Sequence, residues 1–317
     1  MTIKIAGTGS ALPNKIMTNK DLEQLVETSD EWIRERTGIC ERRIAQGDTV
    51  ASLAATACER ALANAGKKAE DVDLILVATC SPEQLLPCAA CQVQSIIGAQ
   101  KAVAFDLNAA CSGFLFGLAT AYSYITAGLY KNALVVGSEV LSKIVDWTDR
   151  GTCILFGDGA GAVYVEATEG PEGFIGFAQG SDGSKGSVLS CNERTDNPEE
   201  DIYVHMDGRE VYKFATRQVP KCIVEAVDRS QLSLEDIDLF VLHQANTRII
   251  ESIAKQLKQD ISKFPVNLPR VGNMSSATIP VLLDELNRDG KLQKGQKIVL
   301  SGFGAGLTYG ACVLTWQ

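Results

Sequence analysis

The chain contains an internal repeat at an offset of 165 residues, and this repeat restricts the possible folds more than any other feature of the sequence. The segment EDVDLILV begins at Glu70, and the similar segment EDIDLFVL begins at Glu235. The same offset moves ALVVG, which ends at Gly137, onto IVLSG, which ends at Gly302. Self-similarity at a fixed offset indicates two copies of one supersecondary unit.

Each copy has the pattern of an α/β unit. Short continuous apolar strands alternate with helical segments such as TVASLAATACERALANAG and NTRIIESIAKQL, as expected for a buried sheet with helices on its faces. We place the two halves at residues 1–168 and 169–317. Because no linker rich in proline or serine separates them, we expect the halves to pack as one body. The least regular stretch, DGSKGSVLSCNERTDNPEED, predicts an exposed loop.

Length and charge exclude several classes of protein. With 317 residues, of which 45% are hydrophobic, the chain can bury a substantial core. Its net charge of -9 argues against general binding to nucleic acid or to anionic membranes. The N-terminal segment MTIKIAGTGSALP lacks the basic and then apolar pattern of a signal peptide, and we therefore expect a cytoplasmic protein.

The ten cysteines are spread along the chain, mostly within apolar segments, and they predict reduced thiols instead of a disulfide framework. Cys88 and Cys91 form a close pair in PCAAC, but a zinc or redox site would need a second pair or nearby histidines. The chain has only two histidines. We therefore expect no metal site and interpret this pair as packing residues.

One long uncharged segment, FDLNAACSGFLFGLATAYSYITAGLYK, carries no charge between Asp106 and Lys131. Its asparagine, serine, threonine and tyrosine side chains argue against a membrane helix, so a central buried helix is expected. Cys111 lies at the first turn of this helix. The cysteine is either a small buried apolar residue or a nucleophile whose pKa is lowered by the helix N-terminus.

Three residues with reactive or polar side chains lie where a predicted strand ends and a helix follows: Cys111, His243 and Asn273. Open α/β sheets bind ligands at such positions. The offset of 165 also moves Cys111 onto Ser276, in the same GNMSSATIP stretch as Asn273. A structural histidine and an N-cap asparagine are the alternative interpretations. Together, however, a thiol, an imidazole and an amide are the groups that acyl transfer through a covalent thioester needs.

Six motifs occur in a fixed order along the chain: TSDEWIRERTGI from Thr28, NAACSGF around Cys111, DRGTCILFGDGAGA from Asp149, HQANTRI from His243, GNMSSATIP from Gly272 and SGFGAGLTYGA from Ser301. Over essentially its whole length, the sequence resembles the β-ketoacyl-[acyl-carrier-protein] synthase III family of the thiolase-like superfamily. The resemblance implies a duplicated five-layered α-β-α-β-α thiolase-like fold that works as a homodimer.

The resemblance also implies a reaction, in which Cys111, His243 and Asn273 match the catalytic triad. Cys111 attacks a short acyl-CoA, and backbone N–H groups of Cys111 and Ala305 stabilise the tetrahedral intermediate. Malonyl-[acyl-carrier-protein] then loses carbon dioxide, and His243 and Asn273 stabilise the resulting enolate, which attacks the acyl group. The product is 3-oxoacyl-[acyl-carrier-protein], the first condensation product of type II fatty acid biosynthesis. No metal or redox cofactor is implied.

Binding residues follow from the same resemblance. Thr28 and Glu31 predict a capping box that starts a helix and places Trp32 and Arg36 on one face. The residues that match contacts to CoA and its pantetheine arm are Thr28, Trp32, Arg36, Arg150, Gly151, Phe156, Gly208, Tyr212, Ala245 and Asn246.

The partner protein in this reaction is the acidic acyl carrier protein, which needs a basic docking surface because the chain itself is acidic. Arg209, Lys213 and Arg217 recur at i, i+4 and i+8 on one predicted helix, and Arg248 and Lys255 lie on the helix after His243. We predict docking at Lys213, Arg248 and Lys255. Solvated surface residues are the alternative interpretation.

Two departures from the family pattern leave the preferred acyl primer open. The usual run of three glycines is Gly304-Ala305-Gly306, where a methyl group could narrow the turn, and residues 274–278 read Met-Ser-Ser-Ala-Thr. Other functions also remain: a condensing enzyme of secondary metabolism, a cysteine thioesterase or hydrolase, and an inactive binding module. A hydroxymethylglutaryl-CoA synthase is disfavoured, because Cys80 stands where that family has a glutamate.

Overall fold

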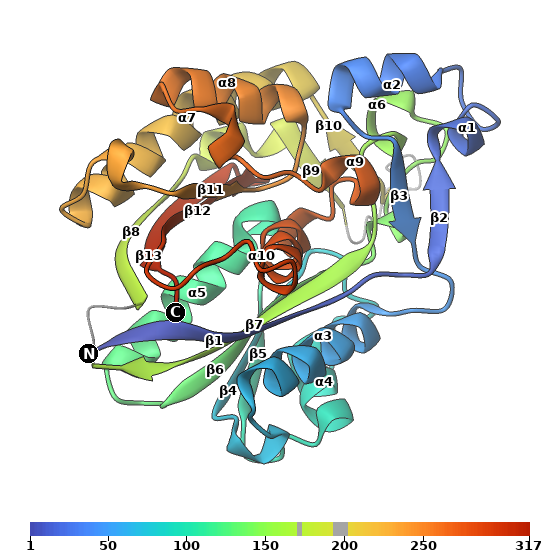
Figure 1. Ribbon diagram of the computed structural model, residues 1–317. Helices are drawn as coiled ribbons and strands as arrows, with labels where there is room; N and C mark the ends of the chain where they lie inside the picture. The colour runs from blue at the N-terminus through green and yellow to red at the C-terminus, as the bar shows by residue number, and fades with distance from the viewer. Residues whose placement is uncertain (170–172, 193–201) are drawn as a thin grey trace.

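The computed structural model of the chain describes residues 1–169, 173–192 and 202–317. Two β-sheets form its framework, with helices packed between them (Figure 1). The first sheet has the strand order β1-β7-β6-β4-β5: β1 (Thr2–Ala11), β7 (Gly159–Thr168), β6 (Asn132–Glu139), β4 (Leu74–Ala78) and β5 (Val103–Leu107). The second has the order β11-β12-β13-β8: β11 (Leu239–Leu242), β12 (Lys297–Gly304), β13 (Thr308–Thr315) and β8 (Gly173–Ser181).

Helices form the three remaining layers. One outer layer contains α3 (Val50–Ala65) and α4 (Ala89–Ile97). The middle layer contains α5 (Gly113–Thr126) and α10 (Thr278–Arg288), and the other outer layer contains α7 (Gly208–Arg229) and α8 (Thr247–Leu257). Figure 1 shows α5 and α10 between the two sheets, α3 and α4 below the first sheet, and α7 and α8 above the second. The predicted five-layered α-β-α-β-α architecture is confirmed. Among the described residues, no helix combines the length and the apolarity needed to cross a bilayer.

Short elements complete the described parts of the chain. The short helices are α1 (Asn19–Leu22), α2 (Asp30–Thr37), α6 (Arg150–Cys153) and α9 (Leu268–Val271), and the short strand pairs are β2 (Lys15–Thr18) with β3 (Glu41–Ile44) and β9 (Leu189–Cys191) with β10 (Val204–Met206). The 3-10 turns are η1 (Ala69–Asp71), η2 (Ala110–Ser112), η3 (Leu141–Lys143), η4 (Gly183–Val188), η5 (Leu234–Asp236), η6 (Ile261–Lys263) and η7 (Ser275–Ala277). The predicted loop over residues 182–201 contains η4 and β9, and its last part, residues 193–201, lies outside the described residues.

The repeat in the sequence is a repeat in the structure. At the offset of 165, η1 corresponds to η5, β4 to β11, η2 to η7 and β6 to β12. Even a local backbone feature is repeated, because Ala110 and Ser275 both have φ of 47°, a conformation that side chains other than glycine seldom adopt. In the part of the chain that is described, β5 has no counterpart in the second sheet.

The apolar core explains why the layers stay together. Phe114 and Leu118 of α5 and Ile279 and Leu283 of α10 are buried in one cluster between the two sheets, so the segment after Cys111 is a core helix as predicted. Two further clusters lie between each sheet and its outer helices. Because the central cluster takes residues from both copies, the two copies share one core. The division at residues 1–168 and 169–317 stays a prediction.

The N-terminal strand is part of the first sheet throughout its length. β1 pairs with β7 in antiparallel register from Thr2 opposite Thr168 to Ala11 opposite Ala160, with one irregularity between Ile5 and Gly7. The pairing therefore joins the start of the chain to a strand that comes more than 150 residues later.

Candidate active site

Two turns, η2 and η7, meet at the centre of the molecule and hold the candidate site. Cys111 is the middle residue of η2, and α5 begins only at Gly113. The predicted position of Cys111 at the start of the central helix is met to within two residues, because the cysteine lies in the 3-10 turn that leads directly into α5. On the other side, Gly304 at the end of β12 packs directly on the cysteine, and a Cβ atom there would come 2.6 Å from the Cys111 nitrogen. Only glycine fits at this position.

The thiol of Cys111 is buried, and its acidity differs from the sequence-based expectation. Burial raises the pKa of Cys111 to about 12; the Ser275 hydroxyl, which hydrogen-bonds the sulfur, acts in the opposite direction, and the carboxylate of Glu139 raises the pKa further. A helix N-terminus was expected to lower this pKa. Desolvation outweighs that effect, because a thiolate loses its hydration in an apolar site. The resting nucleophile is therefore a neutral thiol.

His243 follows β11 and is almost fully buried. Its Nδ1 atom lies 2.6 Å from the hydroxyl oxygen of Thr278, and the edge of its ring contacts Phe303 at 5.4 Å between centroids. Burial lowers the pKa of His243 to about 3, so the imidazole is neutral near pH 7. The Thr278 hydroxyl also lies 3.0 Å from the carbonyl oxygen of Ser275. The hydroxyl has one hydrogen: if Thr278 donates it to the Ser275 carbonyl, Thr278 accepts from a protonated Nδ1, and if Thr278 donates it to Nδ1, the ring proton is on Nε2, which is then a donor.

Asn273 is held by backbone and side-chain hydrogen bonds. Its backbone N–H donates to Leu155 (2.9 Å), and its carbonyl accepts from the Gly157 N–H (3.0 Å). The side-chain Oδ1 accepts from the backbone N–H of Ser275 (2.9 Å). This bond fixes the orientation of the amide, and no hydrogen bond joins its Nδ2 group to any described residue. The two Nδ2 hydrogens are therefore available as donors.

The three predicted residues thus converge on one turn. Ser275 contacts the Cys111 sulfur through its side chain and Asn273 through its backbone, and Thr278 contacts His243. Sequence analysis missed the roles of Ser275 and Thr278. The signal was present, because the offset of 165 places them opposite Ala110 and Gly113, but a stretch of small residues alone does not show which neighbours it touches.

A cavity of about 1140 Å³ reaches this turn. At the reactive end its wall includes Cys111, Ser275, Phe156 and Ala305. Farther out the wall is largely apolar and includes Leu141, Ile144, Leu189 and Val204. A large cavity lined by both apolar and polar side chains is typical of a site for a small molecule.

The departure at Ala305 does not strain its turn. Within Gly304-Ala305-Gly306, glycine is required at the first position by the contact with Cys111 and at the third by a φ of 131°, a conformation open mainly to glycine. Ala305 has no positive φ and accepts a hydrogen bond from Thr308 through its carbonyl (3.0 Å). Its N–H group is retained next to the cavity.

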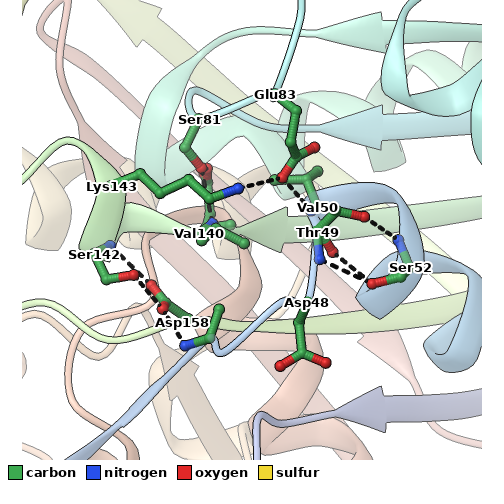
Figure 2. Close-up of polar contacts among 12 residues, drawn as sticks. Asp48, Thr49, Val50, Ser52, Ser81, Glu83, Val140, Ser142, Lys143 and Asp158 are labelled. Carbon is green, nitrogen blue, oxygen red and sulfur yellow. Dashed lines mark hydrogen bonds and ion pairs between the residues drawn. The ribbon is translucent and has the colours of Figure 1, made fainter.

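The loop after β4 forms another wall of the cavity, and Figure 2 shows how it is fixed. Glu83 accepts hydrogen bonds from the Val50 N–H at the start of α3 (2.7 Å) and from Lys143 of η3 (3.2 Å). Ser81 accepts from the Val140 N–H just after β6 (2.9 Å). These bonds tie the loop to three neighbouring elements, so this side of the cavity is a fixed surface.

A second cluster of predicted residues surrounds an aromatic ring. The guanidinium carbons of Arg36 and Arg150 lie 4.7 Å and 4.8 Å from the centre of the Trp32 ring. The predicted placement of Trp32 and Arg36 on one helix face is confirmed. The predicted capping box of Thr28 and Glu31 is wrong: α2 begins at Asp30 and is capped by Ser29, whose hydroxyl accepts from the Trp32 N–H.

The cap lies one residue later because Ser29 has the extended backbone that an N-cap requires. This leaves the buried hydroxyl of Thr28 without a hydrogen-bond partner among the described residues. Asn246 caps α8 and donates from Nδ2 to the carbonyl of Arg36 (2.9 Å). The start of α8 is thereby joined to the end of α2.

The other predicted residues are more scattered. Of the predicted CoA contacts, Phe156 lines the cavity, whereas Gly151 follows the Asp149 cap of α6, Gly208 is the first residue of α7, and Ala245 lies before α8. Tyr212 on α7 is exposed. The predicted docking residues Lys213, Arg248 and Lys255 are all exposed on α7 and α8, and Lys213 forms an ion pair with Glu210 (2.6 Å).

The described residues contain no group of three or more histidine, cysteine or acidic side chains arranged to hold a metal ion. The groups that could act on a substrate are instead the thiol, the imidazole, the amide and the backbone N–H groups around η7. This set can form a thioester and stabilise negative charge on oxygen.

Comparisons with known proteins agree with this chemistry. Residues 105–183 match the family model of 3-oxoacyl-[acyl-carrier-protein] synthase III, and residues 227–316 match the model of its C-terminal part. A beta-ketoacyl-[acyl-carrier-protein] synthase III of Clostridium acetobutylicum is 50% identical, and the match covers 99% of each chain. The crystal structure of 3-oxoacyl-[acyl-carrier-protein] synthase III from Aquifex aeolicus is 43% identical with a TM-score of 0.95, covering 99% of this chain and 100% of that one.

One of the similar solved structures is named for a polyketide pathway. The priming beta-ketosynthase of the R1128 polyketide biosynthetic pathway is 33% identical with a TM-score of 0.95, covering 99% of this chain and 96% of that one. The Clostridium acetobutylicum and Aquifex aeolicus synthases are more similar in sequence to this chain than the polyketide enzyme is. Sequence and fold together show that the chain belongs to the β-ketoacyl-[acyl-carrier-protein] synthase III family of acyl-transferring condensing enzymes.

Proposed function

We propose that the chain condenses a short acyl-CoA with malonyl-[acyl-carrier-protein] to give 3-oxoacyl-[acyl-carrier-protein], carbon dioxide and CoA, through an acyl group on Cys111. This would be the first condensation of type II fatty acid biosynthesis. The observation that carries the proposal is the η7 turn, which contacts Cys111, His243 and Asn273 at once. A nucleophile and two neutral donors held on one turn suit a two-step reaction at one carbonyl group.

In the first step, the Cys111 sulfur attacks the thioester carbonyl of acyl-CoA, the carbon–sulfur bond to CoA breaks, and CoA leaves. The N–H groups of Cys111 and Ala305 face the developing oxyanion in this proposal. Its support is that both residues line the reactive end of the cavity and that Gly304 packs against Cys111. Preorganised backbone donors of this kind stabilise a tetrahedral intermediate strongly.

In the second step, malonyl-[acyl-carrier-protein] enters and loses carbon dioxide. Nε2 of His243 and Nδ2 of Asn273 donate to the thioester oxygen of the resulting enolate, and its carbon attacks the acyl-Cys111 carbonyl. A neutral His243 supports this role, because a donor of neutral charge stabilises the enolate without protonating it fully. The electrons stay within the two thioesters, so the proposed reaction uses neither a metal nor a redox cofactor.

An assay with several primers tests this function. Acetyl-, branched and longer acyl-CoA are each supplied with malonyl-[acyl-carrier-protein], and both the 3-oxoacyl product and free acid are measured by mass spectrometry. Condensation with at least one short primer is expected. Release of free acid without condensation would instead support the cysteine hydrolase, and use of a specialised primer alone would support a role in secondary metabolism.

We place the CoA nucleotide at the cluster of Trp32, Arg36 and Arg150, with the unpartnered hydroxyl of Thr28 beside it. The aromatic ring offers a stacking surface to the adenine, and the two guanidinium groups attract phosphates. Gly151, Phe156, Gly208, Tyr212, Ala245 and Asn246 are assigned to the pantetheine arm on family resemblance.

The Trp32→Ala variant is expected to raise KM for acyl-CoA roughly twofold to thirtyfold, because a stacked cationic pair of this type contributes ~0.5–2 kcal/mol. The matched control is the substrate: an acyl-pantetheine without the adenine nucleotide should give the same KM in parent and variant. An equal loss with both substrates would place the nucleotide elsewhere and assign Trp32 to the stability of α2.

We place the acyl carrier protein over α7 and α8, which lie side by side on the outer face of the second sheet (Figure 1). Reversing Lys213 and Arg248 to glutamate should raise KM for malonyl-[acyl-carrier-protein] and flatten its dependence on salt, because rim charges mainly steer association. Acylation by free acyl-CoA should stay unchanged. Lys213 is already paired with Glu210, whereas Arg248 has no ion pair among the described residues. We therefore expect Arg248 to contribute more than Lys213 to the attraction of the carrier protein.

The control for this experiment is the Lys68→Glu/Lys291→Glu double variant, which makes the same change in net charge at exposed positions on other elements. The control should keep the parental KM and salt dependence. If both double variants behave alike, net charge alone sets the association rate, and the docking surface has been assigned wrongly.

We also propose a homodimer built on the free edge of the first sheet. β5 is the last strand of this sheet, Val103 at its start is 46% exposed, and Leu86 in the preceding loop is 85% exposed. An apolar edge strand is usually covered by a partner, and a second copy can pair there about a two-fold axis. The mass in solution, measured by sedimentation, tests whether the chain is a dimer.

We place the enzyme in the cytoplasm, since no disulfide joins cysteines of the described chain.

A further inference from the structure

A buried carboxylate lies close to the reactive thiol and is not used by the reaction described above. Glu139, the last residue of β6, is completely buried, and no lysine or arginine of the described residues forms an ion pair with it. Its Oε2 accepts hydrogen bonds from the Thr79 hydroxyl (3.1 Å), the Cys80 N–H (3.0 Å) and the Ser81 hydroxyl (2.6 Å). Three hydrogen-bond donors thus converge on one carboxylate oxygen.

A continuous chain of side chains links this carboxylate to Cys111. The Cys80 sulfur lies 3.5 Å from both carboxylate oxygens of Glu139 and 3.8 Å from the hydroxyl oxygen of Ser275. Ser275 also lies with Cys111 in the wall of the same cavity, and its hydroxyl acts to lower the pKa of the Cys111 thiol. The thiol of Cys80 and the hydroxyl of Ser275 can each donate one hydrogen and accept another. Four groups from four separate segments therefore form a path along which a proton can move.

The surroundings of Glu139 fit either protonation state. The Ser276 hydroxyl oxygen lies 2.9 Å from Glu139 Oε1 and 2.8 Å from the carbonyl oxygen of Ala78. Ser276 has a single hydroxyl hydrogen. With Glu139 ionised, Ser276 donates to Oε1; with a proton on Oε1, Glu139 donates to Ser276, and Ser276 donates to the Ala78 carbonyl. Ser276 can therefore hydrogen-bond Oε1 of Glu139 in either arrangement.

The nucleophile needs such an acceptor. The Cys111 thiol is buried and neutral at rest, and the nearby carboxylate disfavours a standing thiolate. Among the described residues, Glu139 is the charged group that raises the pKa of both the Cys111 and the Cys80 thiol, and Cys111 also raises that of Cys80. His243, beyond β11, is kept neutral by its burial and is bonded to Thr278. The proton must therefore leave during the attack, toward a base within reach.

We propose that Glu139 receives the Cys111 proton through Ser275 and Cys80 while the acyl-enzyme forms. As the sulfur–hydrogen bond of Cys111 breaks, its proton passes to the Ser275 oxygen, the Ser275 hydrogen passes to the Cys80 sulfur, and the Cys80 hydrogen passes to the carboxylate. The electron pair of the Cys111 sulfur forms the bond to the acyl carbon, and the bond to CoA breaks. The CoA thiolate regains one proton by the reverse path, which leaves CoA as a thiol and Glu139 ionised. This role rests on the proposed acyl transfer.

A matched pair of variants at Cys80 tests the path. Cys80→Ser keeps a group that both donates and accepts, whereas Cys80→Ala removes it with less disturbance of apolar packing. Single-turnover acylation of Cys111, followed by intact-protein mass spectrometry, should fall about 100-fold in Cys80→Ala and stay within about tenfold of the parent in Cys80→Ser. The Cys58→Ala variant, which removes a buried thiol of α3 far from the path, controls for the loss of a thiol as such.

The Glu139→Gln variant tests the base itself. Glutamine can place its oxygen toward the three donors and its amide nitrogen toward Ser276, so it mimics the protonated glutamate and should keep the melting temperature. Its acylation rate should rise about tenfold per pH unit between about pH 6 and 9, as solvent hydroxide replaces the lost base, while the parental rate is nearly flat there. Alkylation of Cys111 by iodoacetamide, measured on its own peptide, should show the same contrast.

The outcomes separate the relay from the function on which it rests. Parental acylation in Cys80→Ala, equal losses in Cys80→Ala and Cys80→Ser, or a parental pH profile in Glu139→Gln would each overturn the relay and leave the acyl transfer intact. The alkylation experiment needs no acyl-CoA. If the contrast in alkylation appears but acyl-CoA never labels Cys111, the proposed function is wrong and the relay to the thiol stands.

Discussion

The Cys111→Ser variant should lose acyl transfer, with condensation falling by at least about 10³-fold. A serine hydroxyl holds its proton far more tightly than a thiol and is a weaker nucleophile toward a thioester. The turn itself tolerates serine, since Ser276 occupies the corresponding place in η7, so the variant should keep the parental melting temperature. Radiolabelled acyl-CoA should leave one acyl group per chain on the parent and none on the variant.

A contrary result would be informative in a specific way. If Cys111→Ser is labelled to the same extent and condenses at the parental rate, the nucleophile is another residue. The other cysteine in the cavity wall near the reactive end is Cys80, so a Cys80→Ala chain labelled in parallel would show whether it carries the acyl group. The same time course, followed for free acid, reveals whether the parent hydrolyses its acyl-enzyme.

Replacing His243 or Asn273 by alanine should slow decarboxylation of the malonyl group much more than acylation of Cys111. Each variant is expected to lose ~10²–10³ of the rate of malonyl decarboxylation, the usual cost of one missing donor to an oxyanion. Acylation of Cys111 should be retained at least in part, because neither side chain is part of the path that contacts the Cys111 sulfur. Release of labelled carbon dioxide measures the first effect, and single-turnover acylation measures the second.

The control for His243→Ala is the same change at His205, the second histidine of the chain, which is exposed on β10. Its decarboxylation rate should equal that of the parent. If either His243→Ala or Asn273→Ala loses acylation and keeps decarboxylation, the replaced residue acts in the first half-reaction and not in the second. If a variant loses both activities and has a lower melting temperature, the replaced residue has a structural role.

The repeat predicted the architecture because each copy carries its own hydrophobic pattern. The matching segments from Glu70 and Glu235 each contain most of a 3-10 turn and the strand that follows it in the structure, and two such copies can bury their strands only by stacking. The uncharged segment after Asp106 predicted a central helix for the same reason. These features are local in the sequence, and a local pattern is enough to find them.

The candidate site was predicted less completely, because its properties depend on contacts between distant residues. The pKa of Cys111 was expected to be lowered by a nearby helix N-terminus. Burial raises it instead, and the surroundings of the thiol include residues remote in the sequence, such as Gly304 and Phe156. The contact of Thr278 with His243 and that of Ser275 with Cys111 join segments that no spacing rule connects. Ser29 displaced Thr28 as the cap of α2 through a one-residue difference in backbone conformation.

The pairing of β1 with β7 has a consequence for the synthesis of the chain on the ribosome. Thr2 is synthesised long before its partner Thr168. At about 5–20 residues per second, the first strand waits on the order of 10–30 s for the strand that covers it. During that interval Ile3 and Ile5, which are buried in the finished core, are exposed on the nascent chain. The first sheet is therefore completed late, and factors that shield apolar nascent segments should act on this protein before residue 168 leaves the ribosome.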